Sequence, residues 1–332
     1  MRSIIDIKQL LSIDDVIDRT NMMKAFATSD NLAFNFATLQ YVKAVPAALF
    51  ARELRLLIAE RQAKGLKTYS VGHDDDKSAA LSYLAFIGFF DFIGLPDFGS
   101  KVRGAAEVAG RYPYLAITRY NYQRFKVAAE YDPYRTESDY IEEESRKIAG
   151  LMKTTDVRNS FFVYAVREIL RNAYEHSGSA DFYAMGQAWP DGGLELVVMD
   201  DGNGILSTLK NKYPKLVSEK DAILAAMRPG ISGVDFTGEN KYNNSGFGLY
   251  VLSEFARKYG SITIVSGTDL ISQTSTSERC ETVYDNGTLV GIYIKAVPPN
   301  AKEIIEKIIS DGEKISIQGE YPIRPSKQTW NF

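Results

Sequence analysis

The sequence predicts an α/β protein with two domains, and three observations lead to this prediction. Between residues 33 and 96, short strand-like runs alternate with longer amphipathic stretches, which is the pattern of an α/β layer. Between residues 181 and 200, two apolar runs are joined by Pro-Asp-Gly-Gly, which is typical of two strands with a tight turn. The chain also has 332 residues, which is long for one hydrophobic core.

The N-terminal domain is expected to be the smaller one. The runs AFNFATL (33–39) and LKTYSV (66–71) look like strands. The amphipathic stretch 47–65 between them predicts a helix that ends at a glycine, and a second, strongly apolar helix is expected over residues 78–94.

The middle of the chain reads as a linker that holds one strand and one helix. YDPYRTESDY (131–140) is polar and turn-rich, which indicates a boundary. YLAITRYNYQRF (114–125) is the strand candidate, and YIEEESRKIAGLM (140–152) is a charged helix. The expected segments are 1–100, 101–145 as the linker, 146–296, and 297–332 as a C-terminal helix and tail.

The C-terminal part is expected to contain four strands and several helices. After the two strands that flank Pro190, a glycine-rich section spans 206–245 with one short helix at 221–227. A helix at 246–260 follows, then strands at 261–267 and 287–294.

Composition excludes several classes of protein. The net charge of −3 comes from 39 basic and 42 acidic residues without a long basic run, so no nucleic-acid surface is expected. A single cysteine, Cys280, cannot form an intrachain disulfide, and no stretch approaches the roughly 20 apolar residues that span a bilayer. A cytoplasmic protein without membrane contact is therefore expected. Two histidines, His73 and His176, exclude a histidine-rich metal site.

The stretch REILRNAYEH (167–176) is an amphipathic helix with an unusual polar side. Its apolar back is formed by positions such as Ile169 and Ala173, whereas Glu168, Asn172 and His176 follow one another around the other side. A solvated face explains such a pattern. A carboxylate beside an amide is also a plausible site for magnesium and water, since both groups supply hard oxygen ligands.

The strand LVVMDDGNG (196–204) ends in two aspartates and two glycines. An ordinary hairpin turn favours the same residues, and a calcium loop fits less well because its further carboxylates are absent. The functional interpretation is a corner that binds a base: Asp200 can accept a hydrogen bond from an exocyclic amine, and glycine lets a flat ring lie against the backbone.

A second glycine motif, NNSGFGLYVL, places Gly246 and Gly248 at the start of a helix. The N–H groups and the dipole of a helix N-terminus attract phosphate, and glycine permits close approach. A flexible loop that enters a core helix is the alternative.

In this order, the motifs resemble those of the GHKL superfamily of ATP-binding domains, which includes DNA gyrase and the histidine kinases. The resemblance covers about residues 146–296. EILRNAYEH is similar to the N-box, DDGNG to the first glycine box and NSGFGL to the second, and NGTLVGIYI is similar to the closing strand.

The resemblance implies a Bergerat-type α/β sandwich, with a mixed, mostly antiparallel sheet, helices on one face, and ATP with Mg²⁺ on the helical side. It assigns Asn172 to magnesium, Asp200 and Thr288 to the adenine, Gly202 and Gly204 to the base pocket, and Gly246, Phe247, Gly248 and Leu249 to the phosphates. Residues 206–245 would form a lid that orders around the triphosphate.

The resemblance also assigns a catalytic role to Glu168, which stands four residues before Asn172. In the hydrolysing members this glutamate activates the attacking water, and loss of such a base typically costs ~10²- to 10⁴-fold in rate. Two departures fit slow turnover. Asn244 stands in place of the first glycine of the second box, and the sequence identifies no catalytic lysine or arginine.

The box NAYEHSG most resembles the anti-sigma-factor serine kinases, whose targets are STAS domains, and residues 1–100 are STAS-like in layout. No serine occurs between Ser29 and Ser70, although Thr38 could replace the acceptor, so this domain is expected to dock or sense a protein partner. His73 lacks the proline that follows a phosphoacceptor histidine, which favours a surface turn.

Three functions are therefore open. The first is a Mg-ATP-dependent conformational switch with slow hydrolysis, for which a homodimer is a candidate assembly. The second is a serine/threonine protein kinase that acts on a STAS-type partner. The third is a module that binds ATP without hydrolysing it.

Overall fold

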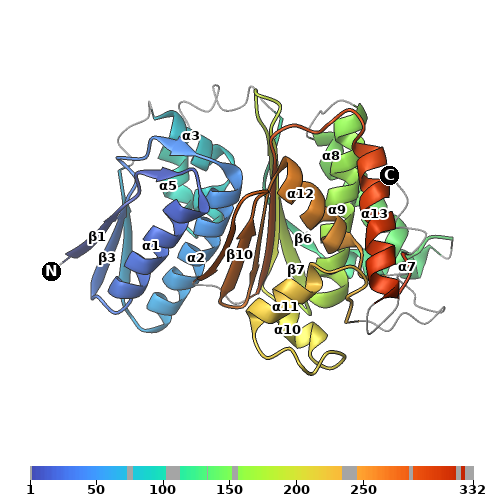
Figure 1. Cartoon of the computed structure of the whole chain (residues 1–332). Helices are drawn as coiled ribbons and strands as arrows, with labels where there is room; N and C mark the ends of the chain where they lie inside the picture. The colour runs from blue at the N-terminus through green and yellow to red at the C-terminus, as the bar shows by residue number, and fades with distance from the viewer. Residues whose placement is uncertain are drawn as a thin grey trace.

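The computed structural model describes residues 2–72, 78–101, 113–132, 134–151, 156–233, 245–283, 287–318 and 323–325. The elements lie in four layers: a small sheet, a layer of helices, a large sheet and a second layer of helices (Figure 1). The predicted α/β class is confirmed. His73 and Asn244 lie outside the described residues.

The small sheet is parallel, with the strand order β1-β3-β5. Its strands are β1 (Arg2–Asp6), β3 (Asn31–Asn35) and β5 (Lys67–Val71), and a separate parallel pair is formed by β2 (Gln9–Leu10) and β4 (Tyr41–Val42). The helices of this part are α1 (Ile13–Phe26), α2 (Ala44–Ala63), α3 (Ala79–Phe86), α4 (Phe89–Phe92) and α5 (Pro96–Lys101).

Two features of this part differ from the sequence prediction. The single helix expected over 78–94 is wrong, because Gly88 takes a left-handed conformation (φ 77°) that separates α3 from α4. Helix α1 was not predicted, although Ser12 and Asp15 form a capping box at its start, a signal that the sequence carries.

The large sheet has seven strands in the order β11-β10-β9-β12-β8-β7-β6. The strands are β6 (Tyr114–Asn121), β7 (Asp181–Ala188), β8 (Leu194–Asp200), β9 (Gly260–Ser266), β10 (Asp269–Gln273), β11 (Glu278–Thr282) and β12 (Thr288–Ile294). Each pairing is antiparallel, so the expectation of a mixed sheet is corrected. Strands that follow each other after a short turn, such as β7 and β8 or β9 and β10, pair antiparallel because the chain reverses its direction at the turn.

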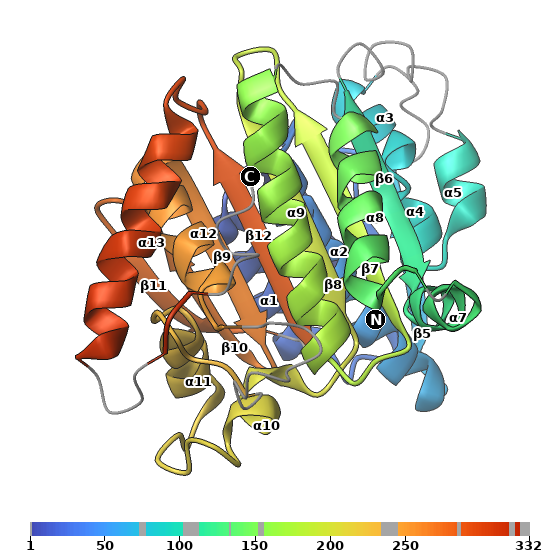
Figure 2. The same cartoon turned by 90° about the vertical axis from the view of Figure 1, so that its right-hand side faces the viewer.

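Helices cover the outer face of this sheet (Figure 2). They are α7 (Gln123–Tyr131), α8 (Glu137–Leu151), α9 (Asp156–His176), α12 (Gly248–Tyr259) and α13 (Ala301–Ile317), while α10 (Gly204–Leu209) and α11 (Glu219–Ala226) lie at one end. Residues 101–145, expected to be a linker, contribute β6 to the sheet and part of α8 to this layer. None of the described helices is long and apolar enough to cross a membrane.

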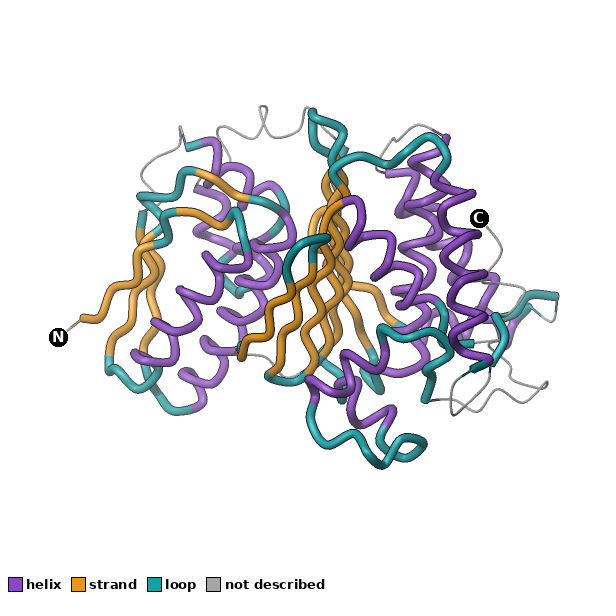
Figure 3. Tube along the Cα trace, viewed as in Figure 1, coloured by secondary structure: helices purple, strands orange, loops and turns teal. Residues whose placement is uncertain are grey.

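Strand β8 is buried on both sides, and this explains how the two parts fit together. Consecutive strand residues point to opposite faces, so Leu196 and Val198 enter the core beneath α9 and α12, whereas Val197 and Met199 enter the core of the N-terminal part. The large sheet therefore lies between two layers of helices (Figure 3). Its inner face completes the hydrophobic core of residues 1–100.

Glu195 joins the two parts at one end of β8. The N-cap of α2, Lys43, makes no side-chain cap, and instead the carboxylate of Glu195 accepts hydrogen bonds from the backbone N–H groups of Ala44 (3.0 Å) and Val45 (3.1 Å) and from Trp189 Nε1 (2.6 Å). Burial raises the pKa of Glu195, and these hydrogen bonds oppose the shift without reversing it.

Candidate functional site

A pocket opens on the helical side of the large sheet, at the ends of β8 and β12. Its empty volume is about 770 Å³ when the solvent at its mouth is included. Its walls come from α9, β8, β12, α10, residues 231–233 and the start of α12. Seven of the residues predicted from sequence line it, namely Asn172, Asp200, Gly204, Gly246, Gly248, Leu249 and Thr288.

Helix α9 forms one wall of the pocket. Asn172 and His176, one turn apart, line it together with the apolar Ile169 and Ala173. The polar side of α9 near its C-terminal end is therefore not a solvated face. Val198 of β8 adds to the apolar surface beneath these residues, so few polar groups face a mostly apolar wall.

Asp200 and Thr288 lie opposite each other on neighbouring strands, at the edge of the pocket. Asp200 is 3% exposed, and its Oδ1 accepts a hydrogen bond from the backbone N–H of Gly202 at 2.9 Å. A buried carboxylate with a fixed orientation is a strong acceptor for a donor on a ligand.

The second glycine motif approaches other backbone closely. Gly246 has a φ of 70°, and a side chain there would overlap the backbone of Ile231, so only glycine fits without strain. The N–H of Gly230 donates to the carbonyl of Gly246 at 3.1 Å. This contact holds residues 230–233 against the start of α12, where Gly248 and Leu249 line the pocket.

Glu168 does not line the pocket. Its side chain is buried, with Oε2 at 2.8 Å from Arg171 Nη2 and Oε1 at 3.2 Å from Arg167 Nη2. Burial lowers the pKa of Arg167, but the attraction of Glu168 and Glu142 outweighs this effect and the pKa is raised. The carboxyl group lies against Gly248, where a side chain would overlap it, so Glu168 stands directly behind the pocket wall.

Two further predicted residues support the pocket without lining it. A side chain at Gly202 would overlap the carbonyl oxygen of Ser177, which follows α9 and accepts a hydrogen bond from the N–H of Asn203 at 2.8 Å. Gly202 thus lets the turn after β8 approach the end of α9. Phe247 is fully buried and packs edge-on against Tyr250 in the core.

The segment 206–245, predicted as a lid, is described as far as residue 233 and at residue 245. Its helices α10 and α11 share a small core of Leu209, Tyr213 and Ala222. Glu219 at the start of α11 accepts hydrogen bonds from the N–H of Leu206 at 3.1 Å and from Ser266 Oγ at 2.5 Å. These bonds fasten α10 and α11 to the end of β9.

His176 lines the pocket, although the sequence placed it on the polar side of its helix without assigning it a role. Burial and the positive charge of Arg171 lower its pKa from 6.5 to about 4, so the ring is neutral at pH 7. Glu175 lies 3.7 Å from His176 Nε2 but also pairs with Arg171 at 3.7 Å. The pairing with Arg171 limits the effect of Glu175 on the pKa of His176.

We expect the stability of the protein to fall as the pH decreases from 6.5 towards 4. The unfolded chain binds a proton at His176 in this range while the folded chain does not, so acid favours unfolding. Between pH 7 and pH 5 this residue should account for about 2 kcal/mol of the free energy of unfolding. Urea unfolding of the wild type and of His176→Gln at both pH values measures it: the difference should shrink in the variant, and an unchanged difference would contradict the neutral ring.

In the described part of the chain, no group of three or more His, Cys, Asp or Glu side chains is arranged to hold a metal ion. Among the residues that the structure describes, those that line the pocket include no lysine or arginine. Comparisons with protein-family models, with curated proteins and with solved structures found no match to this chain.

Proposed function

We propose that the protein binds Mg-ATP in this pocket and acts as a nucleotide-dependent switch in which hydrolysis is slow. The observation that carries the proposal is the convergence of three motifs, spread over about 80 residues of the sequence, on the walls of one pocket. Each motif supplies the group that a different part of the nucleotide requires.

The base end of the nucleotide fits the corner between β8 and β12. The carboxylate of Asp200 is an acceptor for the exocyclic amine of adenine, and Thr288 offers a hydroxyl next to it. Val198 adds an apolar surface beside these two residues, against which a flat ring can lie. Gly204, with a φ of 77°, also lines the pocket, and a side chain there would meet Glu219 and Ser266.

The phosphate end fits the start of α12. This helix has 12 residues, and its N-terminal N–H groups and dipole favour an anion next to Gly246 and Gly248. Asn172 faces the same pocket and offers an amide oxygen, a ligand type that Mg²⁺ accepts together with phosphate oxygens and water.

Slow hydrolysis follows from the environment of Glu168. The carboxylate of Glu168 pairs with Arg167 and Arg171 and does not line the pocket, so it is not placed to activate a water molecule there. Turnover requires Glu168 to exchange at least one of these ion pairs for the attacking water.

The same environment favours a second candidate, a module that binds ATP without hydrolysing it. Incubation of the purified protein with ATP labelled on the γ-phosphate separates the possibilities. Release of free phosphate supports the switch, and binding without release supports the module. Label on the protein would instead support a kinase.

Calorimetry with ATP tests the proposal itself, with Mg²⁺ and with a chelator. We expect Asn172→Ala to lose the effect of Mg²⁺, with affinity for Mg-ATP reduced about 10-fold because one oxygen ligand is missing. Asn121→Ala is the control, because it removes the same amide group from the exposed edge of the large sheet. It should change neither the affinity for Mg-ATP nor the effect of Mg²⁺. The absence of heat with ATP and ADP in the wild type would refute nucleotide binding.

A further inference from the structure

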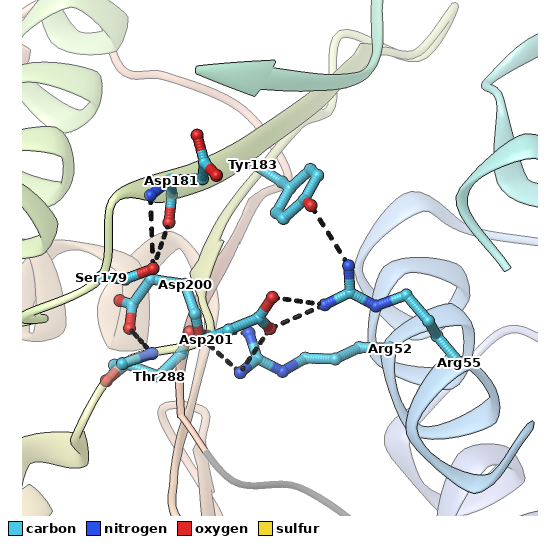
Figure 4. Close-up of polar contacts among 9 residues, drawn as sticks. Arg52, Arg55, Ser179, Asp181, Tyr183, Asp200, Asp201 and Thr288 are labelled. Atoms are coloured by element: carbon cyan, nitrogen blue, oxygen red, sulfur yellow. Dashed lines mark hydrogen bonds and ion pairs between the residues drawn. The ribbon is translucent and has the colours of Figure 1, made fainter. Parts of the chain in front are cut away.

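Asp200, the last residue of β8, and Asp201, the residue after it, point to opposite sides of the large sheet (Figure 4). Neighbouring strand residues alternate between faces. Asp200 therefore lines the pocket, whereas Asp201 turns to the N-terminal part and meets two arginines of α2. Within the motif DDGNG, Asp200 thus lines the pocket, and Asp201 contacts helix α2 of the N-terminal part.

Arg52 of α2 binds the backbone of both strands at the edge of the pocket. Its side chain is 1% exposed, and Nη1 donates to the carbonyl of Thr288 at 3.0 Å while Nη2 donates to the carbonyl of Asp200 at 2.5 Å. Nη2 also lies 3.7 Å from Asp201 Oδ1. A side chain at Gly287 would overlap this guanidinium, so the turn before β12 leaves room for it.

Arg55, almost one turn further along α2, holds the second aspartate. Its Nη2 contacts both carboxylate oxygens of Asp201, at 2.7 and 2.8 Å, and Nη1 donates to the hydroxyl of Tyr183 at 3.3 Å. The guanidinium also stacks 4.4 Å above the ring of Phe92, which fixes its orientation.

These contacts act on the two residues whose side chains face the base end of the pocket. Asp200 and Thr288 are register partners, and Arg52 connects their carbonyl groups from behind the sheet. Hydrogen bonds from a charged donor are stronger than those between neutral groups. Without Arg52, both carbonyls would lose a charged donor, so the strand ends would separate or move towards water.

We propose that Arg52, supported by Arg55, is a positioning residue for the pocket: helix α2 of the N-terminal part sets the spacing of Asp200 and Thr288. The identity of the ligand, an adenine nucleotide, rests on the proposed function. Coupling between sites is reciprocal, so occupancy of the pocket should in turn strengthen the seating of α2 on the sheet. The N-terminal part then regulates the pocket although none of its described residues lines it.

The first test needs no ligand. Hydrogen exchange is measured on the whole chain for the wild type, Arg52→Met and Glu195→Gln. In Arg52→Met, backbone amides of residues 200–204 and 288–291 should exchange about 10-fold faster, which corresponds to about 1.4 kcal/mol. Glu195→Gln alters the same interface at the other end of β8, roughly 17 Å away, and should leave these amides unchanged.

The second test measures affinity for ATP and ADP. Arg52→Met should weaken both by the same factor, about 10-fold, because the change affects the base end and not the phosphates. Glu195→Gln should bind both within about twofold of the wild type, a difference of ~0.4 kcal/mol. Arg52→Lys should restore little of the affinity for ATP and ADP, since an ammonium group lacks the planar guanidinium that reaches two carbonyls.

The outcomes separate this proposal from the proposed function. If the wild type binds no nucleotide, nucleotide binding fails, and the exchange measurement alone decides whether Arg52 positions the strand ends. Unchanged exchange at both strand ends in Arg52→Met, equal changes in Glu195→Gln, or a loss confined to ATP would overturn the positioning role. If Arg52→Met does not fold, Asp201→Asn is used in its place. Amide exchange at both strand ends should then be about threefold faster, and the affinities for ATP and ADP about threefold weaker.

Discussion

Asp200→Asn is expected to weaken the binding of ATP and ADP by about 100-fold, or about 2.7 kcal/mol. The carboxylate is 3% exposed and faces the pocket, so a bond from the adenine amine to it is charge-assisted and shielded from water. Asparagine has the same shape but replaces one acceptor oxygen with a donor. The amide then keeps its oxygen for the N–H of Gly202 and presents its NH₂ group to the amine, or loses the bond to Gly202.

The neighbouring aspartate supplies the control for this prediction. Asp201→Asn removes the same charge one residue away, but its side chain faces Arg55 on the other side of the sheet and is 41% exposed. Calorimetry should therefore give a loss of only about threefold for Asp201→Asn. Similar losses in the two variants would show that overall charge, and not a contact of Asp200, governs affinity.

Gly202→Ala is expected to destabilise the protein by about 3 kcal/mol, the upper part of the usual range for overpacking. A methyl group there would overlap the carbonyl oxygen of Ser177, a backbone atom that cannot turn away as a side chain can. The turn after β8 would have to move away from the end of α9, and the hydrogen bond from Asn203 to Ser177 would lengthen.

Urea unfolding measures this effect, and Gly150→Ala is the matched control. Gly150 lies inside α8, and a methyl group there would meet no atom within 4 Å. Alanine is the better helix former, so this variant should gain about 0.5–1 kcal/mol. If Gly202→Ala were as stable as the wild type, the close approach of the turn to α9 would be incorrect.

The pattern of β8 predicted a strand but not what would cover it. LELVVMD is nearly continuous in apolar residues, and such a run is typical of a strand buried on both faces. The pattern of apolar residues does not indicate that the second cover is the N-terminal part of the same chain. That arrangement depends on contacts between residues more than a hundred positions apart, such as Arg52 with Asp200 and Glu195 with Ala44.

The role assigned to Glu168 illustrates a second limit. Spacing placed Glu168 and Asn172 one turn apart on α9, and this spacing is correct, yet only Asn172 lines the pocket. The arginines on either side, Arg167 and Arg171, are visible in the sequence, and a pair three residues apart is within reach on a helix. Whether they would turn towards Glu168 or towards solvent depended on burial, which periodicity does not reveal.

Local rules predicted many of the strands and helices, because backbone preferences and the spacing of apolar residues act over a few positions, but they did not reveal α1 or the break at Gly88. They also placed an amide, a carboxylate and two glycines at the ends of elements that could meet. Only the tertiary structure decided that α2 covers the inner face of the large sheet and that Asp200 and Asp201 serve opposite faces. The physical reason is that an apolar face or a charged side chain can be satisfied by any partner of suitable shape and charge. Which partner it meets is therefore decided only when the whole chain packs.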